Sequence, residues 1–412
     1  LPIYSFSAGR GQGGNITIDS QNGAIDTTQG QLTSNSFGGS GGDIAIAGTR
    51  DILTGKITSI AESNGSAGNI SIETTGGAID TTAGRLSSSS MGGDGGNVSL
   101  MATGDINTEV IDSFSKGNGN GGNITLDSGG NIDTTAGLLS SRADGNGNGG
   151  NVTVTADGNI NASLVESFSD GSGRGGNIVL DAGGDIDTTG ELVIQIGGAA
   201  MKEGELLSRS RRGDGGNVTL RADGNINTAL VESLSDGRGR GGNIVMDAGG
   251  DIDTTAGELI SRSRRGAGGD VSLTSGGNLS ALAIESLSEN GEGGDINLTA
   301  VGDIDTTEGG LVSRSQTGDG GNVTLSSSEG NISTAAIESL SENGKGGDIN
   351  LTAAGEIDTT LGELTSRSRE GDGGSVALNS GGNISTAEIE SLSKGGRGGD
   401  ISLNAEIGRA HV

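Results

Sequence analysis

A short phrase of the form Gly-Gly-Asn/Asp-Ile/Val-x-Ile/Leu recurs, with small variations, 15 times along the 412 residues. Successive copies begin 25 to 28 residues apart, except for one spacing of 40 residues. A fixed period in this range is typical of solenoids, in which each repeat stacks on its neighbours. The repeat therefore outweighs the 30% hydrophobic content and the net charge of −29, which would indicate disorder in a sequence without a repeat.

Within each repeat, apolar residues alternate with polar ones in short bursts, as in Ile124-Thr125-Leu126, and Gly, Asn, Asp and Ser separate the bursts. Such alternation between turn-forming residues predicts strands rather than helices. Three bursts fit each repeat, so we expect three strands and three corners, which make one coil of a parallel β-helix. Sharp corners need positive φ angles, which Gly adopts freely and Asn tolerates. The Asn residues expected to serve as structural corners are Asn15, Asn69, Asn123, Asn177 and Asn243.

The copies alternate between two types. One type continues into Ile-Asp-Thr-Thr, as at 132–135, and the other ends in an apolar–acidic–serine run, as at 231–233. The predicted fold is all-β: a single-stranded parallel β-helix solenoid of about 15 coils of 25–28 residues, in an alternating two-coil repeat over residues 11–405. Pro2 is the only proline, which fits a stack of central strands in which a proline would remove a ladder hydrogen bond.

Three segments depart from the repeat. Residues 1–10 are expected to form an irregular lead-in of a truncated chain. The 40-residue spacing contains an insertion at about 193–206, for which an inert excursion and a binding loop both remain open. Residues 406–412 leave the repeat and resemble the translation of a sequencing adapter, so they are interpreted as a non-native tail.

Charged residues form two columns near the end of the repeats. One column carries arginines in the Ile-Asp-Thr-Thr type, and the other carries acids in the second type. Stacking would place each Arg between two acids, which avoids repulsion between like charges at strand spacing. The alignment is defined to within one or two positions, because the corners of the two types differ in length. The predicted structural charge ladder consists of Arg142, Glu166, Arg209, Glu232, Arg262, Glu285, Arg314, Glu338, Arg367 and Glu390.

Composition excludes several kinds of site. The sequence has no cysteine, and its only histidine is His411, so disulfides, thiolate metal sites and His-based triads are not expected. The acidic residues belong to repeated columns, and the aromatic residues do not cluster beyond Tyr4 and Phe6. We therefore predict no enzyme activity, no catalytic residues, and no cofactor or metal ligands. Weak calcium binding by stacked Asp residues stays open.

The same composition bears on partners. A net charge of −29 repels nucleic acid, so no nucleic-acid partner is expected. No stretch approaches the ~18 apolar residues of a membrane-spanning helix, so membrane insertion is not expected.

Residues 121–135 read Gly-Gly-Asn-Ile-Thr-Leu-Asp-Ser-Gly-Gly-Asn-Ile-Asp-Thr-Thr. This segment resembles the repeats of filamentous-haemagglutinin-like exoproteins of Gram-negative bacteria, which belong to the two-partner secretion group. The resemblance covers roughly residues 11–405. It implies a long right-handed parallel β-helix that is extracellular or held at the outer cell surface of a Gram-negative bacterium. It also implies export by an outer-membrane partner transporter, although the family's amino-terminal secretion domain is absent from this sequence.

The expected function is that of a non-catalytic, secreted or cell-surface β-helical adhesin or stalk segment. It would mediate attachment or aggregation through an unknown ligand on a cell surface or in the extracellular matrix. One alternative is a calcium-stabilised surface-layer or matrix structural protein. A more distant alternative is a polysaccharide-active β-helix enzyme.

Overall fold

The residues that follow each Gly-Gly corner form a five-residue strand whose alternate side chains point inward. In β12 (Ile124–Ser128), Ile124 and Leu126 are fully buried, whereas Asp127 is exposed. Each residue lies opposite its counterpart in the next turn, in parallel, so that Ile124 pairs with Val152. Matching apolar residues therefore stack into a continuous core inside the coil.

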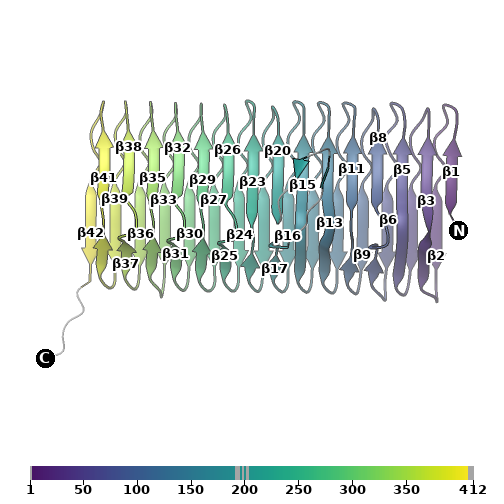
Figure 1. Cartoon of the computed structure of the whole chain (residues 1–412), viewed down its shortest axis with the longest axis horizontal. Helices are drawn as coiled ribbons and strands as arrows, with labels where there is room; N and C mark the ends of the chain where they lie inside the picture. The colour runs from purple at the N-terminus through teal and green to yellow at the C-terminus, as the bar shows by residue number, and fades with distance from the viewer. Residues whose placement is uncertain (1, 191–194, 197–198, 201–203, 407–412) are drawn as a thin grey trace. The chain divides into compact units, whose positions relative to one another are not determined.

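A computed structural model describes residues 2–190, 195–196, 199–200 and 204–406. The chain divides into two compact units, Leu1–Thr219 and Leu220–Val412. Both are parallel β-solenoids, with about 14 turns in all, which confirms the predicted all-β fold. The 15 repeat starts enclose 14 intervals, so the number of turns agrees with the sequence period. Figure 1 shows the strands of each unit side by side, one turn after another.

The first strands of successive turns form one parallel sheet in each unit. In the first unit they are β2 (Ile16–Ser20), β4 (Ile44–Gly48), β6 (Ile70–Thr74), β9 (Val98–Ala102), β12, β14 (Val152–Ala156) and β16 (Ile178–Ala182). In the second unit they are β24 (Ile244–Ala248), β27 (Val271–Ser275), β30 (Ile296–Ala300), β33 (Val323–Ser327), β36 (Ile349–Ala353), β39 (Val376–Ser380) and β42 (Ile401–Ala405). One further first strand, β21 (Val218–Ala222), crosses the boundary between the units.

The second and third strands of each turn form the other long sheet. In four turns of the first unit they join into one strand of 10 or 12 residues, namely β3 (Ile25–Ser36), β5 (Ile52–Ala61), β13 (Ile132–Ala143) and β15 (Ile160–Ser169). The remaining strands of this kind in the first unit are β7 (Ile79–Asp80), β8 (Leu86–Ser90), β10 (Ile106–Asn107), β11 (Ile111–Ser115), β17 (Ile186–Asp187) and β20 (Glu205–Ser210).

The second unit keeps its second and third strands separate. The second strands are β22 (Ile226–Asn227), β25 (Ile252–Thr254), β28 (Leu279–Ala281), β31 (Ile304–Thr306), β34 (Ile332–Thr334), β37 (Ile357–Thr359) and β40 (Ile384–Thr386). The third strands are β23 (Leu230–Ser235), β26 (Leu259–Ser263), β29 (Ile284–Ser288), β32 (Leu311–Ser315), β35 (Ile337–Ser341), β38 (Leu364–Ser368) and β41 (Ile389–Ser393).

Of the three segments that depart from the repeat, the one at the amino-terminal end differs from its expected irregular structure. Residues 1–10 are not irregular throughout, because β1 (Ile3–Ser7) pairs in parallel with β3. The insertion at about 193–206 contains β18 (Gln195–Ile196), antiparallel to β19 (Ala199–Ala200). Residues 193, 194, 197, 198 and 201–203 lie outside the described residues, and so does the tail beyond 406. The last strand among the described residues is β42.

The corner glycines are required by close approach rather than by positive φ. Among the described residues no non-glycine has a positive φ, and Gly204, within the insertion at about 193–206, is the one glycine that does. The corner positions instead stack on the preceding turn: a Cβ on Gly122 would lie 2.5 Å from the carbonyl carbon of Gly96. Real Cβ atoms do not approach backbone this closely, so the stack has no room for a side chain. The prediction that Gly and Asn at these corners adopt positive φ angles was therefore wrong.

An inward serine in each third strand links the corners of two turns. The Ser141 hydroxyl donates to the carbonyl of Gly122 (2.8 Å) and accepts the N–H of Gly150 (2.8 Å). Ser113 does the same between Gly96 and Gly122. These serines are fully buried, so their hydroxyls satisfy backbone groups that cannot reach water. Sequence reasoning assigned them no role.

The Ile-Asp-Thr-Thr phrase closes the second strand by a local hydrogen-bond motif. Asp26 Oδ1 accepts both the backbone N–H (2.9 Å) and the hydroxyl (2.7 Å) of Thr28. These two hydrogen bonds lower the pKa of Asp26 below its ordinary value, and Thr360 lowers the pKa of Asp358 in the same way. The first Thr of the pair points inward, as Thr254 does with no exposed surface. The phrase therefore serves the turn itself.

Candidate functional site

The predicted corner asparagines lie immediately before the first strands and form side-chain ladders. Asn123 Oδ1 accepts the backbone N–H of Asn151 (2.9 Å), the equivalent residue of the next turn. Each of the other predicted corners makes the same bond to the next turn: Asn15 with Asp43, Asn69 with Asn97, Asn177 with Asn217, and Asn243 with Asp270. Asn or Asp is thus needed at this corner as a hydrogen-bond acceptor.

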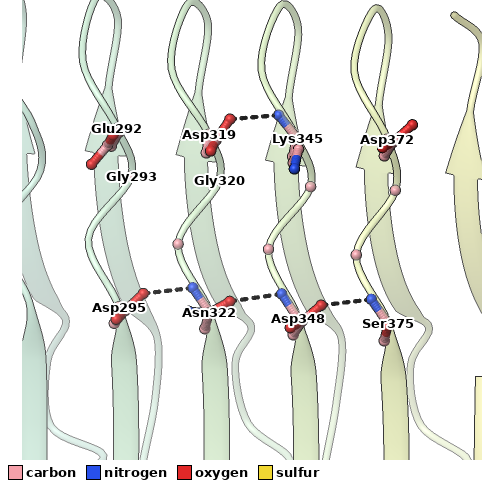
Figure 2. Close-up of a pocket in the computed structure, with 15 residues that line it drawn as sticks. Glu292, Gly293, Asp295, Asp319, Gly320, Asn322, Lys345, Asp348, Asp372 and Ser375 are labelled. Carbon is pink, nitrogen blue, oxygen red and sulfur yellow. Dashed lines mark hydrogen bonds between the residues drawn. The ribbon is translucent and has the colours of Figure 1, made fainter. Parts of the chain in front are cut away.

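An acidic groove of about 580 Å³ runs along these corners in the second unit. In Figure 2, Asp295, Asn322, Asp348 and Ser375 form one row, in which each side chain accepts the N–H of the next residue. In a parallel row, Asp319 accepts the N–H of Lys345 (2.7 Å). The carboxylates of the groove therefore hold successive turns together. Among the described residues, no group of three or more acidic or histidine side chains is arranged to hold a metal ion.

The two charged columns of the third strands do not stack directly on each other. Arg142 lies opposite Phe168, and Glu166 lies opposite Ser140. The inward serines set this register, because Ser141 pairs with Ser167 and thereby shifts the columns by two positions. The same offset recurs in the second unit, where Arg262 lies opposite Leu287.

The predicted ladder is therefore corrected to two adjacent columns. One column contains Arg142, Arg209, Arg262, Arg314 and Arg367, and the other contains Glu166, Glu232, Glu285, Glu338 and Glu390. The opposite charges meet diagonally: Arg142 favours the ionised form of Glu166, and Arg262 that of Glu285. Direct stacking was wrong, whereas a contribution of these charges to stability stays a prediction.

The first unit carries a hollow of about 550 Å³ on this outward face, over β11, β13, β15 and β20. Its outer column is Phe114, Arg142, Phe168 and Arg209 on successive strands. In the second unit the phenylalanine positions of this column carry leucine. Two of the four phenylalanines therefore meet in one hollow. The expectation that no aromatic residues cluster beyond Tyr4 and Phe6 was wrong.

Arg142 is fixed in place at the centre of the hollow. Its guanidinium carbon lies 5.6 Å from the centre of the Phe168 ring, a cation–π distance. Its Nε pairs with Asp144, and an Nη lies 3.8 Å from the carboxylate of Asp170. Arg209 lies over the same ring at 5.9 Å. The arginine therefore presents its planar donors in one orientation.

The second column, Asp112, Ser140, Glu166 and Leu207, lies beside the first, and its two acids are buried. Asp112 pairs with Arg85 and accepts the hydroxyl of Ser87 (3.0 Å). Glu166 is 9% exposed and accepts the hydroxyl of Ser140. Burial raises the pKa of Glu166 above its ordinary value, and this effect outweighs the hydrogen bond from Ser140 and the charge of Arg142.

Because of this pKa shift, we expect the free energy of unfolding to depend on pH. Since the folded protein binds this proton more tightly than the unfolded chain, Glu166 lowers stability as pH rises from its ordinary pKa of 4.5 through the raised value. We expect Glu166→Gln to raise the free energy of unfolding by about 1 kcal/mol near pH 7. The difference should shrink below pH 4.5, where the native Glu is protonated as well.

Denaturant titrations at several pH values measure this difference. Glu338→Gln is the matched control, because Glu338 occupies the same repeat position but is only half-buried. A gain that is independent of pH, or equal in both variants, would contradict the assigned role of Glu166.

Sequence reasoning missed the phenylalanines of this site, although a signal was present. Every other third strand of the second unit repeats the run Glu-Ser-Leu-Ser, as at 232–235, while 112–115 and 166–169 carry Phe in place of Leu. A departure from a repeated column marks a position that serves something other than the repeat. The burial of Asp112 and Glu166 could not be inferred, because the equivalent glutamates of the second unit, such as Glu285 and Glu338, are more exposed.

Fold and site together define a parallel β-solenoid repeat protein with a hollow on the outward face of its first unit. No family model and no curated protein matches the chain. The described part of the chain contains no helix with the length and apolar character needed to span a membrane.

Proposed function

We propose that this chain is a non-catalytic segment of an exported, cell-surface adhesin, in which a solenoid scaffold displays a binding site. The observation that carries the proposal is the hollow of the first unit, whose lining departs from the repeated columns of the second unit. In the second unit the columns of this face repeat from turn to turn, as repeats that only build a scaffold require. A single set of distinct side chains on such a scaffold is the expected form of a binding site.

Binding fits the hollow better than catalysis does. Each of its two buried carboxylates has a protein partner, Arg85 for Asp112 and Ser140 for Glu166. Arg142 is likewise held by Asp144 and by the Phe168 ring. Side chains fixed in this way provide a rigid surface, which lowers the entropic cost of binding a ligand.

The extracellular location and export through a partner transporter rest on the resemblance of 121–135 to filamentous-haemagglutinin-like repeats. The absence of cysteine and the charge of −29 are compatible with both. The calcium-stabilised alternative has less support, because carboxylates of the acidic groove, such as Asp319 and Asp348, already accept backbone N–H groups.

The proposal is tested by an attachment assay. Beads coated with the chain are incubated with epithelial cells, with Gram-negative cells and with surfaces coated in extracellular matrix. We expect saturable attachment to at least one of them, reduced by an excess of the soluble chain. Beads coated with an unrelated protein of similar negative charge are the control. Attachment equal to this control on every surface would refute the adhesive function.

A further inference from the structure

Glu166, in the lining of the hollow, has a carboxyl group in which only one of the two oxygens accepts a hydrogen bond from the part of the chain that the structure describes. Glu166 is 9% exposed and lines the hollow. Ser140 donates a hydrogen bond to its Oε1, and the described residues supply no hydrogen bond to its Oε2. Oε2 is not among the buried side-chain atoms that lack a partner, so it is open to the hollow, where a ligand with a hydroxyl or amide donor can form a charge-assisted hydrogen bond with it.

The walls of the hollow combine apolar surface with oriented donors. Leu138 and Leu207 line it together with the rings of Phe114 and Phe168. Arg142, between the two rings on the neighbouring strands, supplies planar N–H donors. A ligand that fits must therefore have both an apolar face and several hydroxyl or carbonyl groups. The volume of about 550 Å³ is in the usual range of small-molecule sites, ~300–1,000 Å³.

The charges of the hollow restrict the ligand further. Four cationic and four acidic side chains line it, so the formal charges of its lining sum to zero. The chain as a whole has a net charge of −29. An anionic ligand would be repelled by the chain as a whole. A cationic ligand would meet the Arg and Lys side chains of the lining. A purely apolar ligand would leave Glu166 buried without a partner for Oε2.

We infer that the hollow binds an uncharged saccharide of one or two rings. A hydroxyl of the sugar donates to Glu166 Oε2, a second hydroxyl accepts from Arg142, and the C–H face of the ring packs on Leu138 and on the part of Phe168 that the two guanidinium groups leave exposed. This inference rests on the proposed adhesive function and names the ligand class of the same site.

Binding of defined neutral sugars to the whole chain tests the inference. The probes are methyl glucoside, methyl galactoside, N-acetylglucosamine, cellobiose, lactose and chitobiose, with trigalacturonate and a heparin tetrasaccharide as charged comparators. Saturation-transfer NMR identifies a binding sugar, and calorimetry measures its affinity. We expect at least one neutral sugar to bind in the millimolar range, more tightly than either charged comparator.

Two substitutions locate the binding. Phe168→Leu introduces the residue that the second unit carries as Leu287, so the fold tolerates it. Glu166→Gln keeps the acceptor for Ser140 and changes the other carboxyl oxygen. We expect each to weaken binding of the neutral sugar about tenfold, which corresponds to about 1.4 kcal/mol. Glu338→Gln, at the equivalent position outside the hollow, should leave binding unchanged.

Three results would overturn the inference: no neutral sugar binds the folded chain, only the charged comparators bind, or a neutral sugar binds Phe168→Leu and Glu166→Gln as tightly as it binds the unsubstituted chain. If coated beads still attach to cells while no sugar binds, the adhesive function stands and the assignment of the hollow fails. If the beads fail to attach while a neutral sugar binds at Phe168, the assignment of the hollow stands and the adhesive function fails.

Discussion

We expect Gly122→Val to lower the free energy of unfolding of the first unit by about 3 kcal/mol or more. The backbone of Gly96, in the preceding turn, occupies the space that a Cβ on Gly122 would need. The obstacle is backbone at the centre of a parallel stack, so it cannot move away as a flexible side chain could. Accommodation requires separating two turns, which also weakens the ladder hydrogen bonds on either side. Guanidinium titrations followed by circular dichroism measure the loss.

Gly9→Val is the control for this substitution. Gly9 has no atom within 4 Å of an added Cβ, and it is exposed. The two substitutions change composition equally, so their difference isolates the close approach between turns. We expect Gly9→Val to change stability by less than about 0.5 kcal/mol. Equal effects of the two variants would show that the corner glycines are not required by packing.

The period, strands and inward faces of the solenoid could be predicted because they depend on local pattern. Alternation such as Ile124-Thr125-Leu126 fixes which side chains point inward, and the spacing of the repeats fixes where the next turn begins. Both signals recur in every turn, so an error in one turn is corrected by the others. This is why the all-β solenoid followed from the sequence, whereas the expected three strands per turn were wrong for the four turns in which the second and third strands join.

Register and cross-turn contacts could not be predicted, because they depend on the lengths of corners that differ between the two types of turn. The third strands are aligned by Ser141 on Ser167, and this alignment places Arg142 against Phe168 instead of Glu166. The role of the glycines was missed for a similar reason. The sequence shows that a residue is glycine. It does not show whether a side chain is excluded there by the backbone conformation or by the backbone of the neighbouring turn.

The candidate site lies where the residues of the third strands differ from those at the equivalent positions of the second unit. Phe114 and Phe168 occupy positions that carry leucine in the second unit. Side-chain columns of a solenoid bring residues two turns apart in sequence onto one surface, at about twice the strand spacing of ~4.8 Å. Substitutions scattered along the chain can therefore meet at one place without changing the scaffold. Comparing each turn with its own consensus is thus a direct way to search such a sequence for binding sites.

The inward serines lead to the second large expected effect, in Ser141→Ala. Without the hydroxyl, the buried carbonyl of Gly122 and the buried N–H of Gly150 both lose their partner. Leaving two buried backbone groups unsatisfied should cost about 2–4 kcal/mol, more than the loss of one ordinary hydrogen bond. Hydrogen exchange resolves the effect locally: the Gly150 amide should exchange faster, whereas amides in the second unit should not change. Ser99→Ala, on the outward face of β9, is the matched control and should change stability by less than about 0.5 kcal/mol. If Ser141→Ala resembles Ser99→Ala, the corners are held by the stacked backbone alone, and the serine column does not stabilise the fold.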